Sequence, residues 1–241
     1  MQKAIVFLKK LGITAVMALI LTSCEFNGIT GSGNVTSENR PVSEDFQKID
    51  AGNGLDVIVE QSPNASITVE ADDNVQKHIT TRIQNGTLYI KSDINSYTNA
   101  TKTITVKMPV ISGIDVGSGA NLDSKNTIKT NAISIKSSSG ANVKVKIETE
   151  KATCEASSGS NIEVSGKAID LETASSSGSG IDAEHLLSNT ITSSASSGST
   201  TDVHPLVSLK AEASSGSNIN YHNTPKNINR KSSSGGSINQ Q

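Results

Sequence analysis

Acidic and histidine side chains recur at matched positions of neighbouring repeats in the C-terminal part of the chain, and these residue types can bind a divalent metal ion. The candidate ligands are Asp182, Asp202, His204 and His222. If the repeats stack as strands about 4.8 Å apart, the two aspartates lie side by side and so do the two histidines. Carboxylates and imidazoles grouped in this way bind divalent cations. The alternative, which we prefer, is a solvated polar face without a metal or other cofactor, because His185 interrupts the column.

A second residue with its own chemistry is Cys24, which ends the segment Leu21-Thr22-Ser23-Cys24. This segment resembles the bacterial lipobox, in which a lipid is attached to the cysteine and cleavage makes that cysteine the new N-terminus. Residues 1–23 would then be a lipoprotein signal peptide, with three lysines before an apolar run that is too short for a stable membrane span. The alternative is an ordinary secretory signal with a chance cysteine. Lipidation of Cys24 would leave Cys154 without an intrachain disulfide partner, because the chain has two cysteines.

Catalytic motifs are weak in this sequence, although serine is abundant. No G-x-S-x-G elbow stands between a strand and a helix, and no nonapeptide carries the aspartate of a calcium-binding solenoid. Polysaccharide-cleaving β-helices are the enzymatic precedent for the shape derived below, but they use aromatic sugar platforms, and aromatic residues make up 2% of this chain. We therefore expect no enzymatic activity and assign no catalytic residue.

The feature that must position these side chains is a phrase of the type Ser-Ser-Gly-Ser-Asn-Ile, which occurs seven times. Its glycines are separated by steps of 21, 19, 19, 20, 18 and 19 residues. A period near twenty without a helical pattern is typical of a solenoid whose coils stack on one another. The seven glycines are Gly119, Gly140, Gly159, Gly178, Gly198, Gly216 and Gly235.

Within each repeat, apolar and polar residues alternate, which is the periodicity of a strand. The third residue after the glycine and the seventh before it are mostly Leu, Val or Ile. One strand therefore enters each glycine corner and a second strand leaves it. We predict an all-β, single-stranded β-helix, a β-solenoid that we expect to be right-handed, with ~19-residue coils. The asparagine two positions after several glycines could form a side-chain ladder between coils, but we prefer its interpretation as a turn residue that tolerates unusual φ.

The rest of the chain divides by composition. We predict a tether of limited structure over residues 24–40, an irregular N-terminal β region or cap over 41–112, and the solenoid repeats over 113–241. The cap prediction depends on alternating segments around turn signals such as Asn85-Gly86, and on larger apolar residues such as Phe46 and Leu55.

Several motifs occur in the order found in one known family. The chain resembles the head GIN domain family, formerly a domain of unknown function, whose members are labelled auto-transporter adhesins. The resemblance covers roughly residues 31–220 and implies an all-β, β-helix-like fold on an exported or lipid-anchored protein, with no catalytic residues. The motifs are Gly31-Ser32-Gly33-Asn34, Arg40-Pro41-Val42, Val69-Glu70-Ala71-Asp72-Asp73-Asn74, Asn85-Gly86-Thr87-Leu88-Tyr89-Ile90 and Gly117-Ser118-Gly119-Ala120.

These observations lead to one functional expectation. The protein is a lipid-anchored component of the cell envelope that presents a solenoid surface for binding or adhesion to a glycan or protein. A glycan-active enzyme and a passive structural component remain the alternatives. The formal net charge of −2 gives no indication of nucleic-acid binding. Residue 25 is Glu rather than the Asp that retains lipoproteins at the inner membrane of enteric bacteria, so we expect an outer-membrane lipoprotein, facing either the periplasm or the outside.

Overall fold

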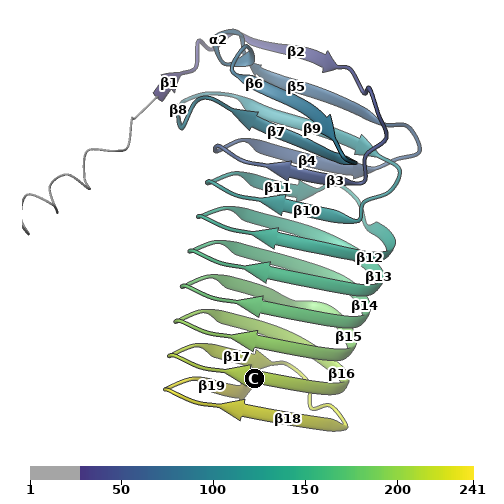
Figure 1. Cartoon of the computed structure of the whole chain (residues 1–241), viewed down its shortest axis with the longest axis vertical. Coiled ribbons are helices and arrows are strands. Elements are labelled where there is room, and N and C mark those ends of the chain that lie inside the picture. Colours follow the sequence, from purple (N-terminus) through teal and green to yellow (C-terminus); the bar gives the residue numbers. More distant parts are fainter. Residues whose placement is uncertain (1–27) are drawn as a thin grey trace, which may run out of the picture.

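The computed structural model describes residues 28–241 and shows a long stack of strands with an irregular region at its N-terminal end (Figure 1). The expectations for the signal peptide and Cys24 fall outside the described residues. The helical structure in the described part is one short helix, α2 (Asp73–Gln76). Within residues 28–241, no helix is long and apolar enough to span a membrane.

The stack is a β-solenoid with coils of about 19 residues, which confirms the predicted fold class. Strands of successive coils pair in parallel and in register, so that Val143 lies beside Ile162 and Ala152 beside Leu171. The main-chain hydrogen bonds therefore run between coils. The strands of this part are β10 (Gly113–Val116), β11 (Asn121–Ser124), β12 (Ile128–Ser137), β13 (Asn142–Ala156), β14 (Asn161–Ser175), β15 (Gly180–Ala195), β16 (Thr200–Ala213), β17 (Asn218–Tyr221), β18 (Asn227–Ser232) and β19 (Ser237–Gln240).

Each serine–glycine corner is a tight turn with two left-handed residues. At one corner Ser158 has φ 55° and Gly159 has φ 70°, and the Ser160 N–H donates to the Ser157 carbonyl over 3.3 Å. Two consecutive positive φ values closed by such a bond define a type I′ turn. The equivalent serine of every repeat has φ between 47° and 55°. The corner therefore depends on the residue before the glycine as well as on the glycine.

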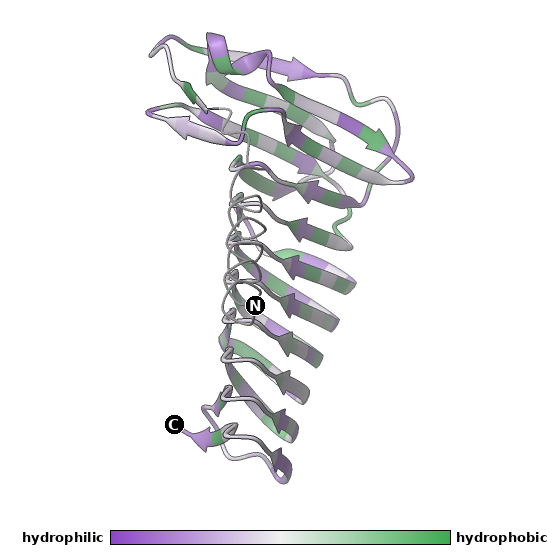
Figure 2. Ribbon diagram, turned by 60° about the vertical axis from the view of Figure 1, so that its left-hand side comes forward, coloured by the Kyte–Doolittle hydropathy of each residue, from purple (hydrophilic) through white to green (hydrophobic). Residues whose placement is uncertain are grey.

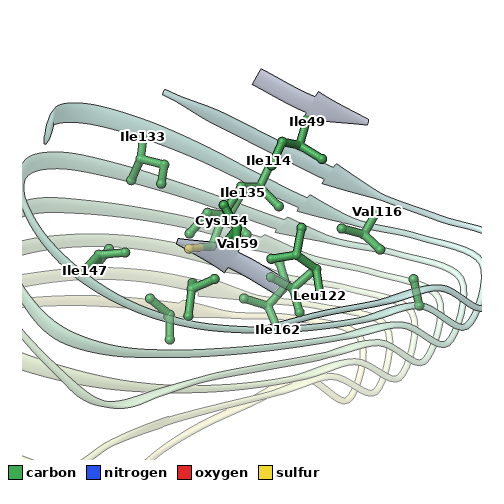
Figure 3. Packing of buried hydrophobic residues seen from close by; sticks show 14 of the residues in the cluster. Ile49, Val59, Ile114, Val116, Leu122, Ile133, Ile135, Ile147, Cys154 and Ile162 are labelled. Carbon is green, nitrogen blue, oxygen red and sulfur yellow. The ribbon is translucent and has the colours of Figure 1, made fainter. Parts of the chain in front are cut away.

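The core is a narrow column of small and medium-sized apolar side chains inside the stacked coils (Figure 3). The inward positions predicted from the alternation are buried, as at Leu122, Ile162 and Ile133. Cys154 is one of these residues, with no exposed surface. Because each coil is covered by its neighbours, the core side chains are buried although the chain has no tryptophan.

Buried serines just after the corner glycines connect neighbouring coils. Ser179 Oγ accepts a hydrogen bond from the Ser176 N–H over 3.1 Å and donates to the Ala156 carbonyl of the preceding coil over 2.8 Å. Ser160, Ser199 and Ser217 make the same pair of contacts. Burial of these hydroxyls is tolerated because both their donor and acceptor functions are satisfied.

The stack begins earlier than the repeats indicated. Strands β3 (Lys48–Ala51) and β4 (Asp56–Gln61) form a coil that pairs in register with β10 and β11. Its corner is Asn53-Gly54, with φ 59° and 68°, so an Asn–Gly pair replaces the Ser–Gly pair in the same turn. Strands β7 (Thr87–Ser92) and β9 (Lys102–Met108) pair in parallel with β3 and β4 and add one more layer.

Antiparallel strands cover the N-terminal end of the stack and act as its cap (Figure 2). Strand β6 (Ile79–Gln84) pairs with β7, and β5 (Ser66–Asp72) pairs with β9. Strand β2 (Val35–Arg40) lies beyond β5, while β1 (Gly28–Thr30) pairs with β8 (Ser96–Thr98). Such a cap removes the exposed edges that the last parallel coil would otherwise present.

The predicted tether of limited structure is therefore wrong for residues 28–40, which form β1, β2 and the turn between them. The buried carboxylate of Asp72 holds this turn, because it accepts the Gly33 N–H over 2.6 Å and the Thr101 N–H over 2.7 Å. Asn74 Oδ1 accepts the Ser32 N–H over 3.1 Å. Main-chain pairing and these polar contacts order a segment that has little apolar surface.

The C-terminal coil ends the stack with polar side chains. Arg230 occupies a position that faces inward in earlier coils, and its guanidinium lies 6.0 Å from the ring centre of Tyr221 and donates to the Tyr221 hydroxyl over 3.2 Å. Ile228 is 41% exposed although its equivalent Leu209 is buried. The cation covers the aromatic ring that would otherwise be the open end of the core.

Candidate functional site

Of the four predicted metal ligands, Asp202 and His222 contact each other, while Asp182 and His204 each contact the main chain of Glu184. His222 Nε2 lies 3.5 Å from Asp202 Oδ1, and His222 Nδ1 lies 3.6 Å from Glu184 Oε1. Asp182 instead accepts the Glu184 N–H over 3.1 Å. His204 Nδ1 donates to the Glu184 carbonyl over 3.2 Å.

An irregularity between β15 and β16 changes which residue of the preceding coil lies beside His204. The register shifts between Ala183 and Leu187, so His204 pairs with Leu187 rather than with Glu184. The next pair of strands stays in register, because the His222 N–H donates to the Val203 carbonyl over 3.0 Å, and this places His222 beside His204. Within residues 28–241, no group of three or more His, Cys, Asp or Glu side chains is arranged to hold a metal ion. The four predicted ligands lie on one polar face, where His222 contacts both Asp202 and Glu184.

The asparagines after the corners form a ladder on the outer face of the solenoid. Asn142 Nδ2 donates to Asn121 Oδ1, and Asn161 Nδ2 donates to Asn142 Oδ1, both over 3.1 Å. Asn121 in turn donates to Asp56 over 2.8 Å. The preferred turn-residue interpretation is therefore wrong for these asparagines, because the left-handed conformation belongs to the serine and glycine of the corner. The ladder stops at Gly180.

Cys154 has the properties of a packing residue rather than a nucleophile. Complete burial raises the pKa of its thiol to about 12. A thiol with so high a pKa carries almost no thiolate at neutral pH, and the thiolate is the reactive form. Cys154 therefore contributes to the core alone.

A groove of about 670 Å³ runs across the coils beside the corners, and we call it the corner groove. One wall is a column of outward residues, each four positions before a corner glycine. The other wall contains a column of serines, each two positions before a corner glycine. The first of these columns is Asp115, Lys136, Glu155, Ala174, Ser194, Glu212 and Lys231, and the second includes Ser138, Ser157, Ser176, Ser196, Ser214 and Ser233.

The charges of the corner groove lie toward its two ends. Lys136 and Glu155 form an ion pair of 2.8 Å, and the hydrogen bond to Glu155 raises the pKa of the Lys136 ammonium group. Burial, together with the nearby charge of Asp50, raises the pKa of the Asp115 carboxyl. Glu212 and Lys231 stand toward the other end, and the small side chains of Ala174 and Ser194 occupy the middle.

A smaller hollow of about 270 Å³ continues the corner groove toward the cap. The two hollows share Asp115 and Lys136, and the smaller one reaches Asp50 and Tyr89. Asp50 Oδ1 accepts an ion-paired hydrogen bond from Lys91 Nζ over 2.6 Å. The result is an elongated depression lined by charged residues, serines and alanines, with one aromatic ring near its cap end.

The sequence did not predict the corner groove. Its serine wall follows the repeat, but its other wall is a column of outward residues whose composition varies without a period. The alternation identifies only the inward columns, and the histidines lie on a different face. One signal was available, namely the change from charged residues at 136 and 155 to Ala174 and Ser194 in the same column.

One known protein family matches most of the chain. The family described as "Putative auto-transporter adhesin, head GIN domain" matches residues 45–225. The chain belongs to this family. The match confirms the resemblance inferred from the ordered motifs, although its two bounds lie later than the expected 31–220. No curated protein sequence matches the chain.

Solved structures of bacterial proteins share the fold of this head GIN domain protein. A "putative adhesin" from Bacteroides fragilis is 20% identical with a TM-score of 0.83, and covers 89% of this chain and 100% of its own. A "putative adhesin" from Parabacteroides merdae is 18% identical with a TM-score of 0.69, over 89% and 99% of the two chains. A "putative lipid binding protein" from Parabacteroides distasonis is 19% identical with a TM-score of 0.71, over the same shares. At these identities the likeness shows a common fold.

Proposed function

We propose that this head GIN domain protein is a lipid-anchored component of the bacterial cell envelope that uses its solenoid as an adhesive or binding surface. The observation that carries the proposal is the corner groove, an open depression that crosses several rigid coils. Stacked coils hold their outward side chains in fixed columns, so a ligand meets a surface that is already organised. The family description, which names adhesins, supports the same function.

The corner groove offers little support for the enzymatic alternative. A glycan-cleaving site would require free carboxylates at a defined separation across the bond that is broken. Glu155 is engaged with Lys136, and no arginine of residues 28–241 lines the groove. Our proposal is therefore a binding protein and includes no catalytic step.

The anchor is tested by replacing the cysteine of the lipobox. Cys24→Ser should abolish labelling by a radioactive or alkyne-bearing fatty acid and should release the protein from the membrane fraction. Cys154→Ala is the matched control, because alanine already occupies the equivalent inward position at Ala211, and this variant should keep both the label and the membrane fractionation. Retention of the label in the Cys24 variant would contradict lipid attachment at this residue.

The binding function is tested on whole cells. A bacterial strain that displays the protein should adhere to host mucus or to polysaccharide-coated plates more than the same strain without the gene. Protease treatment of intact cells determines whether the domain faces outward. Equal adhesion of the two strains on every surface would contradict the proposed function, and sucrose-gradient separation of the membranes tests the outer-membrane location.

A further inference from the structure

The shape of the corner groove indicates a linear ligand. The groove crosses the strands rather than following one of them, and its lining repeats with each coil at about 4.8 Å. A compact small molecule would contact one or two coils, whereas a chain in an extended conformation would contact all of them. Repeated weak contacts along one chain add to a useful affinity because the later contacts are intramolecular.

Between its charged ends, the groove presents serine hydroxyls as its hydrogen-bonding side chains. Among the described residues, the side chains of Ser157, Ser176 and Ser196 make no hydrogen bond with another residue, although their main-chain N–H groups do. Each hydroxyl is both a donor and an acceptor. A ligand that is itself rich in hydroxyls can satisfy such a row in either direction.

The main chain beneath the groove is not open to a peptide ligand. Its N–H and C=O groups are engaged between coils, as in the parallel register of Ala174 with Ser194 and of Ser194 with Glu212. An extended peptide binds a sheet chiefly by adding a strand to a free edge, and this groove lies on a face. A peptide laid across the coils would leave most of its own amide groups with serine hydroxyls as the available partners.

The charges that line the corner groove favour a neutral ligand chain over a charged one. Lys136 is neutralised by Glu155, Glu212 lies beside Lys210 at 3.4 Å, and the middle of the groove carries Ala174 and Ser194. A polyanion requires an excess of cations along its path. The described lining of the groove has no such excess, because carboxylates accompany the lysines at both ends.

We propose that the corner groove binds a single neutral polysaccharide chain laid across the coils, with Tyr89 available to a sugar ring at the cap end. This inference rests on the proposed function and names the ligand class of the same surface. Small side chains at positions 174 and 194 leave room for the sugar rings, and the serine row supplies their hydroxyl partners. Aromatic rings pack against the apolar faces of sugars, and Tyr89 lines the hollow that continues the groove.

The test uses the full-length lipidated protein in a detergent without a sugar headgroup. The probes are cellohexaose, laminarihexaose, chitohexaose and mannohexaose, with oligogalacturonate and a serine–glycine peptide of similar length as comparisons. Binding is measured by isothermal titration calorimetry and by saturation-transfer NMR. The double variant Ala174→Phe with Ser194→Phe fills the groove, and Thr192→Phe is the control, since it adds the same ring to an outward position of the same strand outside the groove.

We expect at least one neutral hexasaccharide to bind, with an affinity that falls about tenfold or more in the double variant and stays unchanged in Thr192→Phe. The inference is overturned if no neutral hexasaccharide binds, if the double variant binds equally well, or if only the oligogalacturonate or the peptide binds. Cell adhesion that persists while every neutral probe fails would overturn the ligand class and leave the proposed function standing. If cells that display the wild-type protein adhere no better than cells without the gene, the proposed function itself is refuted.

Discussion

Gly166 is the position where a single added methyl group should damage the solenoid most. It lies in β14 next to a register shift and has φ 114°, outside the ordinary left-handed region. A Cβ built there would lie 2.0 Å from the Ile147 carbonyl oxygen of the preceding coil. Because that oxygen belongs to the main chain of a packed strand, it cannot move without disturbing the pairing of β13 with β14.

The cost of Gly166→Ala follows from two terms. A residue held in a sparsely populated backbone region costs about 1–3 kcal/mol. Overpacking against a rigid neighbour costs about 1–3 kcal/mol more. The sum is about 2–6 kcal/mol. Gly159→Ala carries only the left-handed backbone term of about 1–2 kcal/mol, since no described residue other than its own chain neighbours has an atom within 4 Å of the added Cβ.

Urea unfolding followed by far-ultraviolet circular dichroism measures both variants. With a slope of about 2 kcal/mol per molar urea, Gly166→Ala should lower the midpoint by about 1–3 M and Gly159→Ala by about 0.5–1 M. Ser165→Ala serves as a neighbouring control and should change little. A midpoint for Gly166→Ala that equals or exceeds that of Gly159→Ala would refute the reasoning. Gly159→Val and Gly178→Val should exceed the alanine cost, because β-branched residues are strained further at positive φ.

Three further predictions concern titration, reactivity and association. Burial and Asp50 raise the pKa of Asp115, so its ionised form opposes folding above the folded-state pKa, and this cost disappears as the pH falls through that value. Asp115→Asn should therefore raise the melting temperature near pH 7 and give no gain near pH 3, and equal gains at both would contradict this. Cys154 should resist a thiol reagent until urea unfolds the protein, since its pKa is about 12, and rapid labelling of the native protein would refute its burial. Arg230→Leu should expose an apolar coil end and cause concentration-dependent association in sedimentation velocity, whereas a variant that stays monomeric would show that Arg230 does not protect this end.

The sequence predicts the solenoid coils best, because every coil has the same geometric requirements. Each corner needs two left-handed residues, and each coil needs its alternate side chains inward, so the glycine steps and the alternation identify the coils. The coil of β3 and β4 was not predicted as part of the solenoid, because its corner is Asn53-Gly54 and lacks the Ser–Gly pair of the other repeats. Strand β2 was not predicted because Val35 is its one bulky apolar residue. The strand forms through main-chain pairing with β5.

The candidate site was less predictable for a different physical reason. Columns of outward residues remain aligned only while the register does, and the shift between Ala183 and Leu187 sets His204 opposite Leu187 instead of Glu184. The corner groove depends on small outward side chains such as Ala174, whose effect appears only when the walls around them are in place. Inward positions repeat because the core constrains them, whereas the outward column that contains Ala174 has no such constraint.

The most direct test of the account compares the adhesion of cells that display the wild-type protein with that of cells displaying the groove-filled Ala174→Phe and Ser194→Phe variant. Surface amounts are matched by antibody, and Thr192→Phe cells serve as the control. Adhesion to plates coated with the neutral polysaccharide that binds best in calorimetry is counted under flow. The account predicts that wild-type and Thr192→Phe cells are retained and that groove-filled cells are washed away. Equal retention of groove-filled and wild-type cells would contradict it.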